Sequence, residues 1–294
     1  MPPTPHETVP ELASVISQLN LRSVGVLRRT DKTLLATAEL AGEAVVVKLL
    51  LDDGGFWATK WRHEIDVYRT FADNPPPVRV PRLVHTDGQR LLVLERLDAR
   101  PLDTDRYPRR RLTDNDIDVV IATLHELAAW RPPAETFAPV FDYPDRVRRY
   151  HTAGYLSDAD RDALHQLLHR CGDQWQLNHG DPVPSNLLLT RGGGCALIDW
   201  EFTGLYLPGF DLAMVHTLVG PANPAVTHRI DEFVVDTAIA RPFAVNLAMV
   251  MTRELRIHRE LPDSPTRRER LQTLNSAWVR GRDLLHATAS DKGA

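Results

Sequence analysis

The 294-residue chain contains only two cysteines, Cys171 and Cys195, which lie far apart in the sequence. Two isolated cysteines do not indicate a structural disulfide of the kind that secreted domains use. No apolar run approaches the roughly 18 residues that a membrane-spanning helix requires. The first residues, Met1 to Glu7, also lack the basic-then-apolar pattern of a secretion signal. We therefore expect a cytoplasmic protein that does not associate with a membrane.

An excess of basic charge is also missing, since the formal net charge is −4 and the isoelectric point is about 6.3. A nucleic-acid partner is therefore not expected. Two arginine-rich runs, residues 106–111 and 146–149, are interleaved with acids, and we interpret them as solvated faces. Lysine is scarce, because only four of the 35 basic residues are lysines, at positions 32, 48, 60 and 292. A lysine inside an apolar strand is thus not the default cation of this chain.

The most informative stretch is the loop around Asp181 and Asn186, which are five residues apart, with Asp199 thirteen residues further on. Two apolar runs, residues 187–189 and 195–198, flank a triple-glycine turn and predict a β-hairpin. A hairpin of that length brings Asn186 and Asp199 to the same end, where two oxygen ligands suit Mg²⁺. Asp181, on the preceding loop, can then reach a substrate hydroxyl beside the metal.

This arrangement resembles the catalytic and metal loops of the protein-kinase-like superfamily, and most closely those of the aminoglycoside phosphotransferase (APH) family of small-molecule kinases. That family writes its loops as His-Gly-Asp-x-x-x-x-Asn and as Ile-Asp-Trp or Ile-Asp-Phe, and this sequence contains both. The resemblance implies that Asp181 is the catalytic base and that Asn186 and Asp199 are the Mg²⁺ ligands. It also implies that His179 braces the loop and does no chemistry.

Lys48 lies in an otherwise apolar, strand-like run, residues 44–51. A buried ammonium is costly unless it is paired, and Glu64 on the helix-like segment 57–71 is the expected partner. Asp66 is near enough that a shift of helix phase would favour it instead. The resemblance implies that the Lys48–Glu64 pair holds the α- and β-phosphates of ATP. The alternative is a lysine that extends to solvent from an edge strand.

Residues 91–97 have the pattern of a buried strand that leads into a linker. The resemblance implies that the hinge, formed by Glu95, Arg96 and Leu97, binds the base of ATP or GTP through backbone groups. The glycine-rich loop of protein kinases is missing between the first two strands, where residues 27–33 contain no glycine. The loop that covers the phosphates is therefore undefined. Arg28, Arg29 or Thr30 could contact phosphate, or the loop could be solvated surface.

Strand-like runs occupy the first third of the chain, and helical periodicity occupies the rest. This distribution predicts an α+β, bilobal, protein-kinase-like fold. We expect an N-terminal nucleotide-binding lobe, residues 1–97, with an antiparallel sheet and one helix. A larger, mainly helical C-terminal lobe, residues 98–294, would carry the catalytic and acceptor sites. We expect one helix to begin near Thr113 or Asp114. Further helices are expected at residues 143–151, 157–171, 208–219, 225–240, 242–259 and 265–287.

Asp211 lies in a stretch that resembles the family's Asp-Pro-x-x-Asp-Leu-Ala signature, although Leu207 replaces its first Asp. The resemblance implies that Asp211 accepts hydrogen bonds from the catalytic-loop backbone, as structural support. Only eleven residues separate Asp199 from Asp211. That interval is too short for a protein kinase's peptide-docking segment, and Val183 occupies the position where such kinases commonly carry a lysine. Both features favour a small-molecule acceptor.

The acceptor pocket implied by the resemblance would draw on Glu201, Tyr206, Asp231 and Glu254, with Glu232, Asp236 and Glu260 as further acids. The helix around residues 253–260 mixes three arginines with two acids, which weakens the case for a polycationic aminoglycoside. A neutral or anionic hydroxylated substrate fits at least as well. High use of Arg, Ala and Leu suggests a GC-rich bacterial genome, so self-resistance by phosphorylation of an antibiotic is the leading hypothesis.

Two other classes of function stay open. The first is a metabolite kinase for a sugar, a choline-like alcohol or an amino alcohol, and the second is a nucleotide-binding pseudokinase. Transfer of AMP is a further possibility that no residue favours. The sequence also leaves open the acceptor and its modified hydroxyl, the choice of ATP or GTP, and whether the protein is a monomer or a homodimer.

Overall fold

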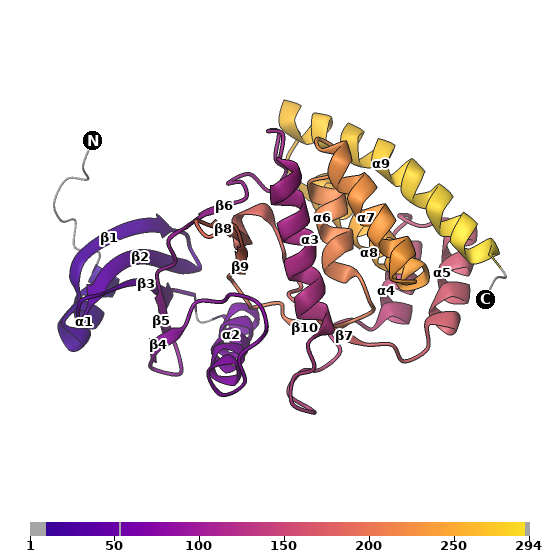
Figure 1. The fold of residues 1–294 in the computed structure, drawn as a ribbon. Coiled ribbons are helices and arrows are strands. Elements are labelled where there is room, and N and C mark those ends of the chain that lie inside the picture. The colour runs from indigo at the N-terminus through magenta and orange to yellow at the C-terminus, as the bar shows by residue number, and fades with distance from the viewer. Residues whose placement is uncertain (1–9, 53, 292–294) are drawn as a thin grey trace.

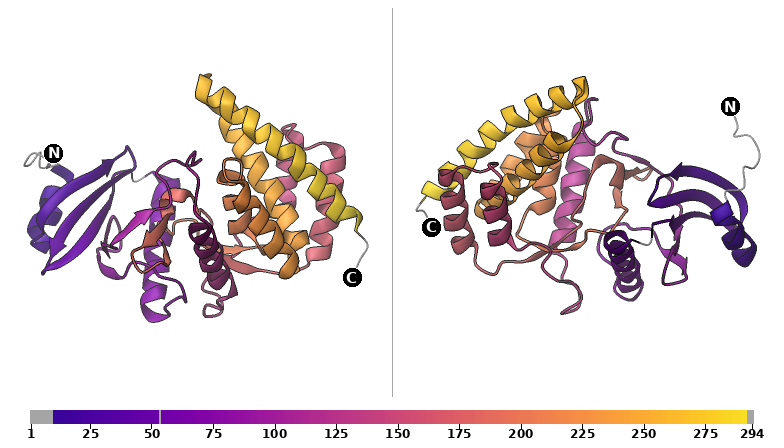
Figure 2. Two further views of the ribbon diagram at one scale, coloured as in Figure 1. Left: turned by 45° about the horizontal axis from the view of Figure 1, so that its top comes forward. Right: turned by 180° about the vertical axis from the view of Figure 1, so that it is seen from behind.

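A computed structural model describes residues 10–52 and 54–291 of the chain. Met1 to Glu7, for which we expected no secretion signal, and Lys292 lie outside the described residues. The fold is α+β, with a sheet at one end of the molecule and a group of helices at the other (Figure 1). Figure 2 shows the same division from two further directions. We refer to the elements from α1 to β5 as the sheet lobe and to those from β6 to α9 as the helical lobe.

The sheet lobe contains one antiparallel sheet of five strands in the order β1-β2-β3-β5-β4. Two helices accompany it, and the shorter one, α1, was not expected from the sequence. Its elements are α1 (Pro10–Leu19), β1 (Arg22–Arg29), β2 (Thr33–Leu40), β3 (Glu43–Leu50), α2 (Gly55–Asp73), β4 (Leu83–Thr86) and β5 (Leu91–Glu95).

The two faces of the sheet bury different cores, because successive side chains of a strand point to opposite faces. Val45 and Val47 of β3 pack with Val93 of β5 and with α1 in a small core on the outer face. Lys48, the next residue after Val47, points to the inner face, where α2 and the helical lobe lie. The alternation in β3 therefore places the lysine toward the rest of the protein.

The helical lobe begins directly after the linker and consists of seven helices of nine or more residues besides short strands, within the described residues. α8 runs through its interior and packs against α5, α6 and α9. The elements are β6 (Ala99–Pro101), α3 (Asp114–Ala129), α4 (Tyr143–Thr152), α5 (Asp158–Cys171), β7 (Gln176–Asn178), β8 (Leu187–Thr190), β9 (Cys195–Leu197), β10 (Gly204–Tyr206), α6 (Phe210–Leu218), α7 (Pro224–Asp236), α8 (Ala240–Glu260) and α9 (Pro265–Ser290).

The helix starts follow local capping chemistry. Thr113 caps α3 by accepting a hydrogen bond from the amide of Asp116 (3.1 Å). Ser157 and Asp160 form a reciprocal capping box at α5, which satisfies two otherwise unpaired backbone groups. The expected hairpin is present as β8 and β9, and it joins β6 in a three-stranded sheet. This hairpin lies at the end of the helical lobe that faces the sheet lobe (Figure 1).

A continuous hydrophobic core joins the two lobes. Phe71 of α2 packs edge-on against Trp200, with ring centroids 4.8 Å apart, and against Trp130 at 5.9 Å. Cys171 and Cys195 are both buried and free. Among the described residues, no helix combines the length and the apolar character needed to cross a bilayer.

Candidate active site

Lys48 lies at the junction of the two lobes, and its side chain is 13% exposed. Its ammonium is 2.6 Å from Oε2 of Glu64 on α2 and 2.5 Å from Oδ1 of Asp199, which follows β9. The Lys48–Glu64 pair expected from the sequence is therefore present, whereas Asp66 is exposed and pairs with Arg69. One ammonium thus links β3, α2 and the β8–β9 hairpin.

Electrostatics keep Lys48 and Asp199 charged. Burial alone would lower the pKa of Lys48, but the carboxylates of Asp199 and Glu64 outweigh burial and raise that pKa above its ordinary value. Burial alone would raise the pKa of Asp199, but Lys48 outweighs it and holds that pKa below its usual range. Asp199 is therefore ionised at neutral pH.

The loop that follows β7 is held by one buried carboxylate. Asp211, in the first turn of α6, accepts the N–H of His179 at Oδ2 (2.6 Å) and the N–H of Gly180 at Oδ1 (2.9 Å). These are the hydrogen bonds expected of Asp211. Its side chain is almost fully buried, and burial raises its pKa to about 7. Two backbone donors offset part of the cost of burying it.

His179 braces the same loop from the other side. Its Nε2 lies 2.9 Å from the carbonyl oxygen of Ile198, which can only accept, so we assign the proton to Nε2. Its Nδ1 then accepts the N–H of Asp181 (3.3 Å). Burial lowers the pKa of His179 to about 4, so the ring is neutral at pH 7. A neutral ring with both nitrogens bonded supports the loop and has no proton to spare.

Gly180 is required at its position. Its φ is +84°, and a Cβ there would lie 2.1 Å from the carbonyl oxygen of Phe202 and 2.6 Å from the hydroxyl of Tyr206. Only glycine combines that backbone angle with so close an approach. The next residue, Asp181, is thereby held against the segment that follows Asp199.

The carboxylate of Asp181 is 22% exposed, and Nη1 of Arg106 lies 4.0 Å from its Oδ1. Burial raises the pKa of Asp181, while the guanidinium groups of Arg253 and Arg106 oppose that rise. The backbone oxygen of Asp181 accepts a hydrogen bond from Nδ2 of Asn186 (3.1 Å). This bond fixes the amide of Asn186 and leaves its Oδ1 with a long contact of 3.4 Å to Ser185.

Asn186 and Asp199 lie at the same end of the hairpin, as expected. The N–H of Ile198 donates to the backbone oxygen of Asn186 (3.2 Å), and both side chains line one cavity. Asp199 has φ of +70°, in the left-handed region that side chains seldom adopt, and such strain concentrates at functional positions. Its side chain is 37% exposed.

The donor set fits Mg²⁺ in the presence of a nucleotide. Within residues 10–52 and 54–291, no group of three His, Cys, Asp or Glu residues could hold a metal. The protein instead offers the ionised carboxylate of Asp199 and the amide oxygen of Asn186. Mg²⁺ typically takes one or two protein oxygens and completes its shell with phosphate oxygens and water. A nucleotide-dependent ion therefore matches these residues better than a permanent one.

The cavity that these residues line has a volume of about 710 Å³ and lies between the sheet and the β8–β9 hairpin. One part of its lining is apolar and the other is polar and charged, which suits a ligand with a flat base and a phosphate chain. The apolar residues are Leu27, Leu35, Val46, Leu94, Leu97, Leu188 and Ile198, and the cations are Arg28, Lys32, Lys48 and Arg96.

The three hinge residues, Glu95 to Leu97, all line this cavity. The N–H groups of Glu95 and Arg96 donate to Arg82 (2.9 Å) and Ala44 (3.0 Å) within the sheet lobe. In the described part of the chain, the N–H of Leu97 has no such partner. It is the hinge donor that a bound base could use.

Two neighbouring arginines of the glycine-free segment before β2, Arg28 and Arg29, have different surroundings. Arg28 lines the cavity, and its charge helps to lower the pKa of Asp199. Arg29 points the other way and pairs with Glu11 of α1 at 2.6 Å. Thr30 also lines the cavity, but its hydroxyl is bonded within its own turn. Of the three residues left open by the sequence, Arg28 is the one with a free charge on the cavity side.

The expected acceptor residues are not brought together. Tyr206 is buried, stacks on Phe210 with ring centroids 4.1 Å apart and donates its hydroxyl to Phe202. Asp231 lies beside His216 on another cavity, between α7, α8 and α9. Neither residue lines the cavity of Asn186 and Asp199, and a contact of either with the acceptor stays a prediction.

Glu201 and Glu254 lie near the site, with different environments. Glu201 is half-buried, and burial together with Asp199 raises its pKa to about 7. Glu254 is completely buried, yet Arg253 and Arg106 outweigh burial and lower its pKa to about 2. Glu254 is therefore ionised but has no surface to offer a cationic acceptor, so the expectation of a direct contact is wrong.

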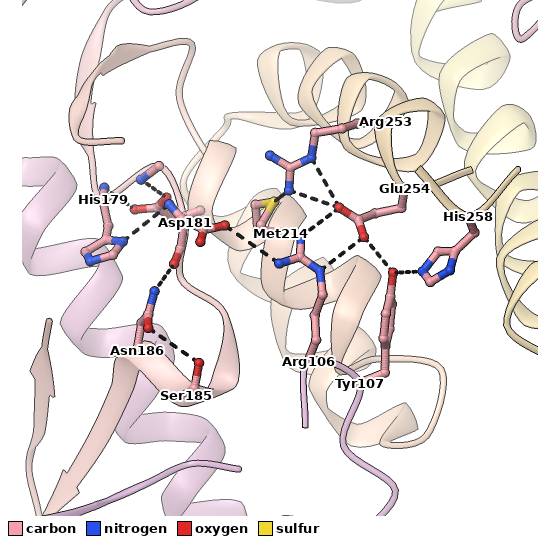
Figure 3. A network of polar contacts seen from close by, with 12 residues as sticks. Arg106, Tyr107, His179, Asp181, Ser185, Asn186, Met214, Arg253, Glu254 and His258 are labelled. Atoms are coloured by element: carbon pink, nitrogen blue, oxygen red, sulfur yellow. Dashed lines mark hydrogen bonds and ion pairs between the residues drawn. The ribbon is translucent and has the colours of Figure 1, made fainter. Parts of the chain in front are cut away.

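Arg106 is the residue that sequence reasoning missed. Figure 3 shows it between Asp181 and Glu254, where its Nη2 lies 2.9 Å from Oε1 of Glu254. Arg253 reaches the same oxygen at 3.0 Å, and the hydroxyl of Tyr107 donates to Oε2 at 2.5 Å. The run 106–111 is thus not a simple solvated face, because Tyr107 and Pro108 are buried. An aromatic residue and a proline within a charged run were the available signal.

Comparisons with known proteins agree with this geometry. The sequence profile of the Phosphotransferase enzyme family (APH) matches residues 37–243. No curated protein matches the sequence.

Solved structures of the same fold include aminoglycoside 2′-phosphotransferase-IIIa in complex with GDP (TM-score 0.63, 16% identity, 94% of this chain and 99% of that one). A thermostable mutant of aminoglycoside phosphotransferase APH(4)-Ia in complex with ADP and hygromycin B has a TM-score of 0.63 and 14% identity, covering 96% of this chain and 98% of that one. A GDP and kanamycin complex of APH(2″)-IIIa has a TM-score of 0.61 and 14% identity, over 92% and 97% of the two chains. The α+β, bilobal fold is therefore kinase-like.

Proposed function

Because the chain belongs to the APH phosphotransferase enzyme family, and is thus a small-molecule kinase that acts on hydroxyl groups, we propose that it transfers the γ-phosphoryl group of ATP to a hydroxylated antibiotic. The observation that carries this proposal is the contact of Lys48 with both Glu64 and Asp199 at the wall of the 710 Å³ cavity. Related folds in complex with hygromycin B or kanamycin support an antibiotic as acceptor.

The nucleotide lies between the lobes, which we divide after Leu97. Its base occupies the apolar part of the cavity, where the N–H of Leu97 is the available donor and the carbonyl of Glu95 the acceptor. Its phosphates occupy the charged part. Lys48, oriented by Glu64, neutralises the α- and β-phosphates.

Asn186 and Asp199 are the residues that would hold Mg²⁺. A bound Mg²⁺ ion supplies charge neutralisation to the transferring group. The left-handed backbone of Asp199 turns its carboxylate into the cavity, where Lys48 keeps it ionised. These residues are thus prepared for a cation before the nucleotide binds.

Asp181 is the proposed catalytic base. It orients the acceptor hydroxyl, whose oxygen forms a new bond to the γ-phosphorus while the bond from that phosphorus to the bridging oxygen of ADP breaks. The hydroxyl proton passes to a carboxylate oxygen of Asp181. Positioning and charge stabilisation supply most of the rate gain. The hydrogen bonds of His179 and Asp211 hold this loop in place and therefore help to position Asp181.

The direct test is to incubate the protein with Mg²⁺, γ-labelled ATP and a panel of hydroxylated antibiotics, and to identify labelled products by mass. Expression in a sensitive bacterium should also lower its susceptibility to the modified compound. Transfer only to a sugar or an amino alcohol would assign a metabolite kinase instead. Nucleotide binding with no transfer to any hydroxylated compound would indicate a pseudokinase.

A further inference from the structure

A second large cavity lies beside Arg106, on the helical lobe. Its volume is about 760 Å³, and its walls are residues 105–109, the C-terminal end of α8 and the beginning of α9. Four arginines and one histidine line it, against two aspartates. The arginines are Arg106, Arg109, Arg267 and Arg270.

Two of the acids around this cavity are already paired, Asp263 and Glu254, whereas Asp105 forms no ion pair with a described residue. Asp263 accepts from Arg267 at 3.0 Å and also from Arg268. Glu254, behind the wall, is buried between Arg106 and Arg253. Asp263 and Glu254 therefore each contact two guanidinium groups, and the net charge of the cavity wall is positive.

Arg270 carries the clearest unsatisfied charge. Its guanidinium lies 3.7 Å from the centroid of the Tyr107 ring, and it forms no ion pair with any other described residue. Burial lowers its pKa, so it has lost part of its hydration. A guanidinium that is partly desolvated, oriented on an aromatic ring and unpaired is well suited to bind an oxyanion.

The ring below Arg270 is itself fixed by polar contacts. The hydroxyl of Tyr107 donates to the ionised Glu254 at 2.5 Å, so it must accept from Nε2 of His258 at 2.6 Å. Tyr107 cannot rotate away without breaking both bonds. The position of the Arg270 guanidinium is therefore supported from beneath.

Arg106 connects this cavity to the proposed catalytic base. It lines the cavity and also lies 4.0 Å from Oδ1 of Asp181. Figure 3 shows Tyr107 and His258 on the side of Glu254 away from Asp181. An acceptor with its hydroxyl at Asp181 and its other end in this cavity would therefore pass beside Arg106.

We propose that this cavity binds an anionic group of the acceptor, either a carboxylate or a phosphoryl group, and that the enzyme discriminates against polycationic aminoglycosides. The inference rests on the proposed function and names the chemical class of its acceptor. An ammonium group placed here would face four guanidinium groups against only two carboxylates, Asp105 and Asp263, of which Asp263 is already paired with Arg267. The same surroundings favour an oxyanion, which Arg106 and Arg270 can approach from two sides.

The test measures binding separately from turnover. The protein is saturated with Mg²⁺ and the non-hydrolysable analogue AMP-PNP, so that anions cannot use the nucleotide site. Calorimetric titrations then compare gluconate and glucose 6-phosphate with glucose, glucosamine and kanamycin. We expect the two anions to bind at least about 10-fold more tightly than the neutral and cationic probes, and their relative affinities identify the preferred oxyanion.

Two variants make the measurement specific. Arg270→Gln should weaken binding of the anions by about 10-fold, in line with the loss of one charge-assisted contact. Arg256→Gln is the matched control, because it removes the same charge from α8, where Arg256 pairs with Glu260 and does not line the cavity. It should leave the anion affinity unchanged.

The proposal is overturned if no anion binds saturably, if kanamycin binds as tightly as the anions, or if both variants behave alike. Phosphotransfer assays on the same probes separate this result from the proposed function. Anion binding without transfer to any hydroxyl would support the anion-binding cavity and contradict the proposed phosphotransfer. Transfer to kanamycin with no preference for anions would support the phosphotransfer and contradict the anion-binding cavity.

Discussion

The ammonium of Lys48 and the carboxylate of Asp199 lie 2.5 Å apart, although 151 residues separate them in the sequence. Among the described residues, this is the ion pair that joins the sheet lobe to the helical lobe. Both partners also line the cavity proposed for the nucleotide. The residues that would bind phosphate and metal are thus the residues that hold the two lobes together.

The first prediction separates the structural role of Lys48 from its catalytic role. Lys48→Met leaves Glu64 buried and Asp199 without their shared cation. We expect a loss of stability near the lower end of the about 3–5 kcal/mol typical of a broken buried pair, because Asp199 is 37% exposed. Urea unfolding measures the loss.

Glu64→Gln in the Lys48→Met background should restore most of that stability, since it removes the uncompensated charge. Phosphotransfer should stay about 10³-fold or more below wild type, because no ammonium neutralises the phosphates. Recovery of activity together with stability would contradict the proposed role of Lys48.

The second prediction concerns Asp181. Asp181→Asn keeps the shape of the side chain, and neither carboxylate oxygen of Asp181 takes part in bracing the loop, which relies on backbone groups. We expect turnover to fall by about 10²–10⁴-fold, the usual contribution of a general base, with the affinity for ATP and the melting temperature unchanged. Single-turnover rates and nucleotide titrations provide the comparison. An equal loss of ATP affinity would assign Asp181 to nucleotide binding instead.

The third prediction is a pH dependence of stability caused by Glu201. Burial together with Asp199 raises its pKa to about 7 in the folded protein, above the value of about 4.5 of a free glutamate. Between these pH values the folded state holds a proton that the unfolded state has released, so stability falls as pH rises from about 4.5 to about 7. Above pH 7 the penalty is complete.

Glu201→Gln removes this penalty. The variant should be more stable than wild type at pH 8, by an amount of the order of 1 kcal/mol because Glu201 is only partly buried, and should show no gain at pH 4. Denaturant unfolding at both pH values tests the difference. A gain of equal size at the two pH values would exclude titration of Glu201 as the cause.

The sequence predicted the parts of the site that are encoded locally. The loop that holds Asp181 and the hairpin that joins Asn186 to Asp199 depend on nearby glycines and apolar runs, so their motif spacing was informative. Lys48 stood out because it lies in an otherwise apolar strand of a chain that has only four lysines. Expected helix limits also agreed with the structure within a few residues where a cap was readable, as at Ser157.

The parts that were missed depend on contacts between distant segments. Arg106 and Glu254 are 148 residues apart, so their pairing could not be read from the sequence, although buried Tyr107 and Pro108 were a local signal beside Arg106. Strands of three residues, such as β7 and β10, are too short to show a period of two. α1 has only ten residues and needs the outer face of the sheet to be stable.

The last prediction concerns the phosphate cover, which lacks glycine. Arg28 and Arg29 are adjacent in β1, and of the two only Arg28 lines the nucleotide cavity, while Arg29 pairs with Glu11. Arg28→Ala should raise the KM for ATP by about 10-fold, since a hydrogen bond to a charged group contributes roughly 1.5–3 kcal/mol. Arg29→Ala, the matched control, should leave that KM unchanged, because its partner lies on the outer face. If both variants bind ATP like wild type, the segment is solvated surface and the phosphates rely on Lys48 and the metal alone. An effect confined to Arg28 would instead show that a strand-borne guanidinium replaces the backbone amides of a glycine-rich loop.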